Sequence, residues 1–115
     1  MIQTNNSSKH YGYNVNLNEI DPKLGRALTY KERRQQLEMI KAANINFIRT
    51  AHYPFNHEFY ELCDEMGFYV CNEIPFGSRG AAYLKQEEYL PNLKARADAT
   101  LRRDKNHPSV IIWSL

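Results

Sequence analysis

The sequence has few cysteines, glycines and prolines, and no long hydrophobic run. Its 115 residues include two cysteines, Cys63 and Cys71, and five residues each of glycine and proline. Two cysteines are too few for a disulfide framework in a chain of this size, so we expect both to be reduced and buried. The longest apolar run, Val110 to Trp113, has the length of a strand. It is too short to cross a membrane, so no membrane partner is expected.

A large excess of charge of either sign is also absent. Fifteen lysines and arginines against thirteen acidic residues give a formal net charge of +2, which gives no reason to expect nucleic acid as a partner. Residues 1–8 contain no basic stretch followed by an apolar core, so no secretion signal is visible and the cytoplasm is the default expectation. With 43% hydrophobic and 24% charged residues, the composition is that of an ordinary globular protein.

Strand patterns alternate with helix patterns along the chain. Residues 1–10 are polar, and we expect a flexible lead-in there. Strands are expected at 11–16, 45–50, 68–71 and 109–115, with a loop-like segment at 72–88. Helices are expected after residue 29, after residue 56 and at 91–103. The order β-α-β-α-β-α-β predicts an α/β fold with parallel strands and right-handed crossovers.

Capping residues mark the ends of two of these helices. Thr29 followed by Glu32 is the capping-box pattern, Asn56 is a second N-cap, and Gly67 is a natural end because glycine adopts the left-handed conformation without steric cost. The polar Arg33 is expected in water. The expected inner faces are Leu37, Ile40 and Ala43 in the first helix, Phe59, Leu62, Cys63 and Met66 in the second, and Leu93, Ala97 and Leu101 in the third. The last strand is apolar almost throughout, which predicts cover on both faces.

Two α/β architectures fit this order, an open doubly wound sheet and part of an eight-stranded barrel. A nucleotide-binding doubly wound sheet needs a glycine-rich turn after its first strand, and residues 16–19 read Asn-Leu-Asn-Glu instead. A complete barrel needs roughly 250 residues, so four strands are about half of one. The residues alone favour the barrel without excluding the other sheet.

Polar residues follow three consecutive strands at the same relative height. Asn16 and Asn18 come after the first strand, His52 after the second and Glu73 after the third. In parallel α/β folds these C-terminal strand ends meet on one face, where ligands bind. We therefore expect these side chains to form a binding site.

Two longer stretches resemble a known family. Residues 46–54, which read NFIRTAHYP, together with Asp64 and residues 67–70, resemble the first signature of glycoside hydrolase family 2, which contains β-galactosidases, β-glucuronidases and β-mannosidases. Residues 104–114 are similar to the start of its second signature, and residues 14–16 and 21–22 resemble its entry into the barrel. The resemblance implies that residues 11–115 are the first half of a glycosidase (β/α)8 barrel, and that the chain is part of a retaining enzyme acting on terminal β-linked, galactose-like sugars.

The resemblance also implies where the catalytic carboxylates lie. In the family a Gly-Asn-Glu triplet follows the second signature and supplies the general acid/base, and a downstream glutamate is the nucleophile. Both positions fall after Leu115, so we expect no catalytic residue within the chain and an internal fragment of a longer glycosidase. A retaining glycosidase needs two carboxyl groups about 5 Å apart. The chain alone should therefore be inactive.

The residues that resemble the family's sugar-binding positions are His52, Glu73, Asn18 and Arg49. His52 is expected at sugar hydroxyls, and Arg49 in the barrel interior, where an unpaired guanidinium would be costly. Glu73 is either an acceptor for a sugar hydroxyl or the partner of Arg49. Asn18 stands where several β-galactosidases carry a histidine, and an amide can still donate and accept hydrogen bonds.

No metal and no cofactor is expected. Some β-galactosidases place magnesium ligands just after the position of Glu73, but residues 74–77 here read Ile-Pro-Phe-Gly, and hard cations need clustered oxygen ligands. The four histidines lack the spacing of a zinc site. His107, before Pro108, is expected to fix the turn into the last strand.

A second hypothesis belongs to a different class. The chain could be a non-catalytic carbohydrate-binding module, or a half-barrel that completes its sheet with another copy of itself. Unpaired strand edges favour association, so this hypothesis predicts self-association through the exposed edges. Under either hypothesis the partner is an oligosaccharide or glycoside.

Overall fold

A computed structural model of the chain describes residues 13–17, 27–76 and 86–115. The expected lead-in at residues 1–10 lies outside the described residues. The elements, in chain order, are β1 (Tyr13–Leu17), α1 (Tyr30–Ala42), β2 (Ile45–Thr50), α2 (His57–Met66), β3 (Tyr69–Glu73), η1 (Glu87–Tyr89), α4 (Leu90–Asp104) and β4 (Val110–Ser114).

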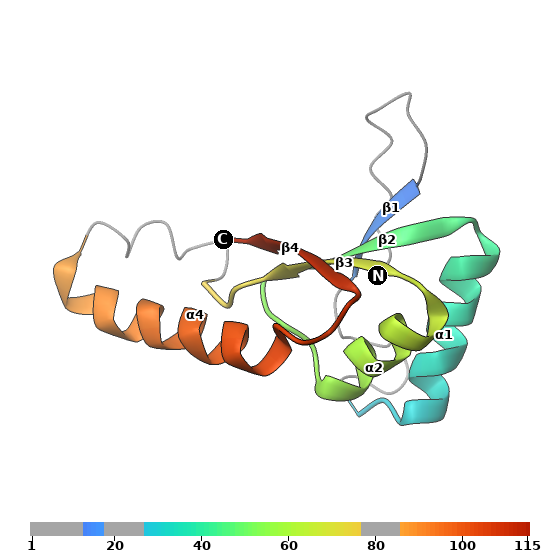
Figure 1. Cartoon of the computed structure of the whole chain (residues 1–115), viewed down its shortest axis with the longest axis horizontal. Helices are drawn as coiled ribbons and strands as arrows, with labels where there is room; N and C mark the ends of the chain where they lie inside the picture. Colours follow the sequence, from blue (N-terminus) through green and yellow to red (C-terminus); the bar gives the residue numbers. More distant parts are fainter. Residues whose placement is uncertain (1–12, 18–26, 77–85) are drawn as a thin grey trace.

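The four strands form one parallel sheet in the order β1-β2-β3-β4. Helices α1, α2 and α4 all lie on one face of this sheet (Figure 1). A doubly wound sheet would reverse its strand order and carry helices on both faces. Sequential strand order with helices on a single face is the arrangement of a (β/α)8 barrel, so the expected fold, a partial barrel, is confirmed.

The core lies between the sheet and the helices α1 and α2. Strand residues such as Ile48 and Val70, both fully buried, contact Phe59 and Leu62 of α2 within one cluster. Burying a side chain of this size stabilises the fold by about 1.5–3 kcal/mol. The other buried members are Leu37, Ile40, Ile45, Phe55, Tyr60, Cys63 and Phe68.

The helix ends follow the capping signals. In α1 the Thr29 amide donates to Glu32 Oε2 (2.8 Å), and the Glu32 amide donates to Thr29 Oγ1 (3.4 Å), a complete capping box. In α2 the Phe59 amide donates to the Asn56 side chain (3.2 Å), and Gly67 ends the helix with φ of 72°. These three predictions are confirmed.

Most positions expected on the inner helix faces are buried, but a few single positions are wrong. Ala43 is exposed because it follows the last residue of α1, where the helical period no longer applies. Arg33 is 4% exposed, since it lies four residues before Leu37 on the buried face. In α4 the buried face is Leu93, Thr100 and Asp104, spaced i, i+7 and i+11, and the expected Leu101 is 38% exposed.

The strand boundaries also differ in places. Strand β3 runs two residues further than expected, so Asn72 and Glu73 belong to the strand and not to the loop-like segment expected from residue 72. Strand β4 carries an extra residue: Val70 pairs with Val110 and Cys71 with Ile112. Ile111 and Ile112 are 52% and 46% exposed. The expectation that this strand is covered on both faces is therefore wrong for the part of the chain that the structure describes.

Candidate active-site face

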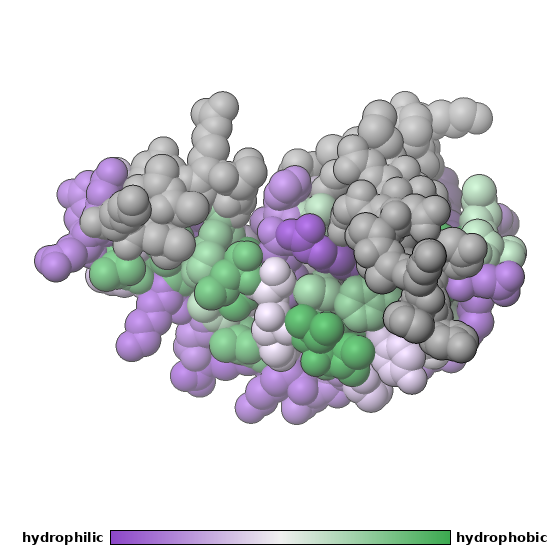
Figure 2. Space-filling view, turned by 90° about the horizontal axis from the view of Figure 1, so that it is seen from above, coloured by the Kyte–Doolittle hydropathy of each residue, from purple (hydrophilic) through white to green (hydrophobic). Residues whose placement is uncertain are grey.

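Side chains of the sheet alternate between the helix face and an open face. Ile48, Thr50, Val70 and Asn72 are fully buried on the helix face. Arg49 pairs in register with Cys71, and Glu73 follows two residues later, so these three lie on the sheet face opposite α1, α2 and α4. Figure 2 looks onto that side of the molecule, where green hydrophobic atoms lie between purple hydrophilic ones.

An ion pair joins the C-terminal ends of β2 and β3 on the open face. Nη2 of Arg49 lies 2.6 Å from Oε2 of Glu73, with side-chain exposures of 41% and 9%. The short distance establishes the ion pair, although no group of the described residues is aligned as a hydrogen-bond partner of Oε2. The carboxylate is thus buried beside a partly exposed guanidinium that offers further N–H donors. Glu73 was expected either to accept a sugar hydroxyl or to pair with Arg49, and the structure shows the pairing with Arg49.

The thiol of Cys71 lies beside this ion pair and is 7% exposed. Burial raises the pKa of Cys71; the positive charge of Arg49 opposes the shift and the negative charge of Glu73 adds to it. The thiol is therefore protonated at neutral pH and is not an activated nucleophile. The two charges of the ion pair act on the thiol, but the thiol itself adds no charge to the pair at neutral pH.

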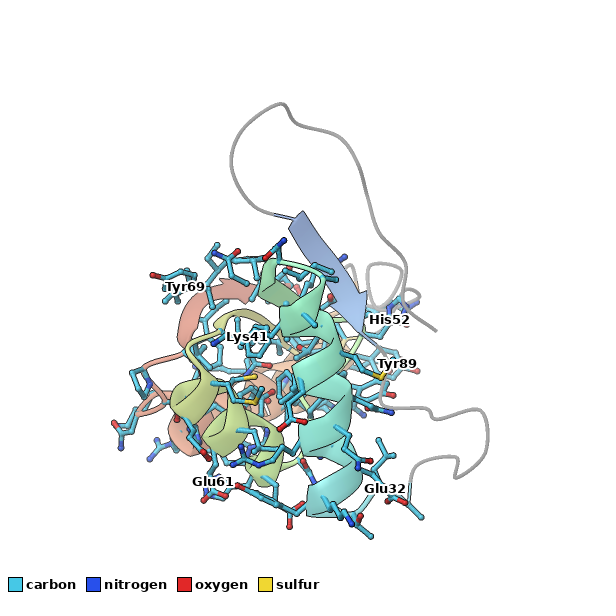
Figure 3. All side chains as sticks on the ribbon, turned by 90° about the vertical axis from the view of Figure 1, so that its right-hand side faces the viewer. Glu32, Lys41, His52, Glu61, Tyr69 and Tyr89 are labelled. Carbon is cyan, nitrogen blue, oxygen red and sulfur yellow. The ribbon has the colours of Figure 1, made fainter. Side chains whose placement is uncertain are left out.

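His52 lies two residues beyond the end of β2 and is exposed, with φ of 74°. In Figure 3 its side chain lies beside the tip of β1, in agreement with the pairing of Leu17 with Thr50. His52 therefore lies at the same end of the sheet as Arg49 and Glu73. The structure brings Arg49 and Glu73 into contact, whereas Asn18 lies outside the described residues.

The sequence analysis missed a buried polar network behind this ion pair. The side chain of Asn72 is fully buried, and its Oδ1 accepts from Thr50 Oγ1 (3.2 Å) and from the Tyr60 hydroxyl (2.8 Å). Its Nδ2 donates to Asp104 Oδ2 (2.8 Å), and Asp104 is held by Arg103 at 2.5 and 2.7 Å. The signal in the sequence was an asparagine inside the apolar run of β3, where a buried amide needs partners.

Burial, together with the charge of Asp104, raises the pKa of Tyr60 above that of a free phenol. The hydroxyl therefore keeps its proton at neutral pH and donates it to Asn72. Asp104 is fully buried and accepts from Arg103 through both oxygens. The phenol, the amide and the carboxylate paired with Arg103 give the hydrogen bonds of the network one consistent direction.

His107 lies at the turn into β4, as expected. Its Nδ1 is 2.6 Å from Asp64 Oδ2, and the amide of Ser109 donates to the other oxygen of Asp64 (2.9 Å). The prediction that His107 fixes this turn is confirmed. Within the described residues no cluster of three or more histidine, cysteine, aspartate or glutamate side chains could hold a metal ion, and no helix is long and apolar enough to cross a membrane.

Comparison with known proteins gives consistent matches. Residues 4–115 match the family model "Glycosyl hydrolases family 2, TIM barrel domain". A β-galactosidase of Halalkalibacterium halodurans is 37% identical over 125 aligned positions, which cover 98% of this chain and 12% of that protein. A β-galactosidase of Photobacterium profundum is 39% identical over 88% of this chain and 10% of its own length.

Solved structures with this fold include a β-glucuronidase from Ruminococcus gnavus in complex with N1-substituted uronic isofagomine. It is 38% identical with a TM-score of 0.76, and the match covers 90% of this chain and 18% of that one. A family 2 glycosyl hydrolase from Bacteroides cellulosilyticus matches with 26% identity and a TM-score of 0.70 over 89% of this chain and 13% of its own. The chain thus spans about a tenth of the length of the curated relatives it matches.

Proposed function

Because the chain belongs to glycosyl hydrolase family 2, with the family's TIM barrel domain matched over residues 4–115, we propose that it forms the first four strands of the barrel of a retaining glycosidase. The proposed substrates are glycosides with a terminal β-linked sugar, with β-galactosides first. The curated relatives named β-galactosidase motivate that order, and the β-glucuronidase structures make β-glucuronides the competing class.

The observation that carries this proposal is the ion pair between Arg49 and Glu73 at the C-terminal ends of β2 and β3. Substrates of barrel enzymes bind at this end of the strands. A carboxylate held by a partly exposed guanidinium is suited to accept a sugar hydroxyl while the guanidinium donates to another oxygen. We assign these two roles to Glu73 and Arg49, and further sugar contacts to His52 and Asn18.

Bond cleavage needs two carboxyl groups, one to protonate the leaving oxygen and one to attack the anomeric carbon. In the proposed role this chain supplies neither. Its residues orient the sugar, and catalysis by orientation depends on positions held to within a fraction of an ångström. We therefore expect the 115-residue chain by itself to leave nitrophenyl β-galactoside and β-glucuronide uncleaved.

The test uses the reading frame that encodes this chain together with its flanking codons. The purified product should release nitrophenol from the β-galactoside, and Glu73→Gln should lower kcat/KM by about 100-fold because it removes the charge that holds Arg49. Glu65→Gln is the matched control, since that exposed carboxylate pairs with Arg34 on the helix side. Absence of turnover of both glycosides by the product would overturn the proposal.

A second candidate function, a module that assembles with its own copies, is favoured by one observation. Strand β4 is the last strand in the order of the sheet; it exposes Ile111 and Ile112, and Leu115, directly after it, is 77% exposed. Unpaired apolar edges favour association. Size-exclusion chromatography of the 115-residue chain over a range of concentrations tests this, and a monomer at every concentration would contradict it.

A further inference from the structure

The hydroxyl of Thr50 links the two strands that carry the Arg49–Glu73 ion pair. Thr50 directly follows Arg49, and its Oγ1 accepts from the amide of Glu73 (2.9 Å) while donating to Asn72 Oδ1 (3.2 Å). The residue is fully buried on the helix face. One hydroxyl therefore ties the main chain of Glu73 to β2, directly behind the ion pair of the open face.

Asn72 holds that hydroxyl in a single orientation. The Tyr60 hydroxyl donates to the same Oδ1 and Asp104 accepts from Nδ2, so a flipped amide would lose the Asp104 bond and place Oδ1 against the acceptor oxygens of Asp104. With its proton directed to Asn72, the Thr50 oxygen presents a lone pair to the Glu73 amide. The orientation of the Asn72 amide thus fixes, through Thr50, the hydrogen bond to the Glu73 backbone next to the ion pair.

The same network holds the loop that carries His52. Tyr60 accepts from the amide of Phe55 (2.9 Å), and Nη2 of Arg103 donates to the Phe55 carbonyl (2.8 Å). The backbone N–H and C=O of Phe55, three residues after His52, are therefore both hydrogen-bonded. The loop after β2 and the end of β3 are therefore attached to one set of buried side chains.

We propose that Thr50 and Asn72 are positioning residues for the Arg49–Glu73 pair, which they hold in the geometry that meets a sugar. The sugar-binding purpose of this arrangement rests on the proposed function, whereas the hydrogen bonds themselves do not depend on it. A stabilising role alone would need no link to the open face, whereas the bond from Glu73 N to Thr50 Oγ1 makes that link. Loss of the Thr50 hydroxyl should therefore loosen the end of β3 locally, without unfolding the core.

Cys71 reports such loosening, since it lies on the open face in register with Arg49 and two residues before Glu73. Cys63 is the internal reference, because it is fully buried in the core and is also a free thiol. Global unfolding exposes both cysteines alike, whereas local opening exposes Cys71 alone. The readout is the ratio of Cys71 to Cys63 labelling by a disulfide reagent, assigned by peptide mass spectrometry.

Thr50→Val keeps the shape of the side chain and removes the hydroxyl. We expect it to raise the Cys71-to-Cys63 labelling ratio about ten-fold, because local opening is governed by the bonds that were lost. Thr50→Ser retains the hydroxyl and should restore the wild-type ratio. Thr100→Val is the matched control, since it removes a buried hydroxyl that only bonds Arg96 within α4 (2.9 Å).

Each outcome decides the inference. A ratio in Thr50→Val equal to that of Thr100→Val would overturn it, because the hydroxyl would then serve only global stability. The labelling needs no glycosidase activity, so it can succeed or fail independently of the proposed function. In an active full-length product, Thr50→Val should lower kcat/KM by about ten-fold and Thr50→Ser should restore it.

Discussion

His52 shows how a single residue is placed by its backbone. Among the described residues, two that are not glycine have positive φ, Asn44 at 59° and His52 at 74°. Positive φ is uncommon outside glycine, although asparagine and histidine are among the residue types enriched there. Such conformations persist where the surrounding structure fixes them, and they cluster at ligand sites. The hydrogen-bonded backbone of Phe55 restrains the same loop three residues after His52, and a binding role for His52 stays a prediction.

Asp64 is a residue whose ionisation should control stability in acid. Burial raises its pKa, but hydrogen bonds from Ser109 and His107 outweigh this effect, and the pKa lies below that of a free aspartate. A carboxyl group with a lowered folded pKa stabilises the fold above its unfolded pKa, about 4, and this contribution is lost as pH falls through the folded value. Asp64→Asn should therefore cost about 1–2 kcal/mol at pH 7 and much less at pH 3.

Urea denaturation of both proteins at the two pH values measures this difference. Asp98→Asn is the control, because Asp98 is exposed to 57% and pairs only with Arg102 along the same helix; its cost should stay below about 0.5 kcal/mol. If Asp64→Asn were equally destabilising at pH 7 and pH 3, the ionised form of Asp64 would not be what holds the turn into β4.

The end of helix α2 depends on the conformation of Gly67. Its φ is 72°, and a Cβ added there would meet only Lys41 Nζ, at 3.9 Å. Gly67→Ala should therefore destabilise the chain by about 1–2 kcal/mol through backbone strain alone. Gly67→Asn should cost less than Gly67→Ala, because asparagine tolerates this conformation. Thermal unfolding followed by circular dichroism gives the order, and an equal loss in both variants would assign the cost to the side chain instead.

The elements could be predicted from the sequence because their signals are local. Thr29, Glu32, Asn56 and Gly67 define helix ends within a few residues of chain. On the inner face of α4, Leu93 was predicted but Thr100 and Asp104 were not; Asp104 lies buried where Asn72 of β3 bonds it across the fold. Long-range bonds of this kind leave no periodic pattern.

The candidate site was likewise predictable only in part. The resemblance and the strand ends predicted Arg49 and Glu73, and their ion pair is confirmed. The buried partners behind the pair were missed, because a polar residue in an apolar strand indicates a need for partners without naming them. Thr50, Tyr60 and Asp104 come from three different elements, and only the fold brings them to Asn72.

At the scale of the molecule, α4 is joined to the rest mainly by polar bonds. Among its apolar side chains Leu93 is buried, at 8% exposure, whereas Leu90 and Leu101 are exposed. Arg103 bonds both oxygens of Asp104 and the carbonyl of Phe55, and its guanidinium lies 5.6 Å from the centre of the Tyr60 ring. These bonds join α4 to the loop after β2 and to α2. Assembly of the fold should therefore be sensitive to this one side chain.

Arg103→Gln tests this sensitivity, with Arg102→Gln as the adjacent control. Removing the guanidinium leaves the fully buried Asp104 without its cation, and an unpaired buried charge is strongly destabilising. Because Arg103 is itself 42% exposed, we expect a cost of about 2–3 kcal/mol, below that of a fully buried pair. Arg102 is 77% exposed and pairs with Asp98 along the helix, so its loss should cost less than about 0.5 kcal/mol. Urea unfolding of the two variants at pH 7 measures the difference; equal midpoints would mean that Leu93 and its apolar contacts, and not the polar network, hold α4 against the sheet.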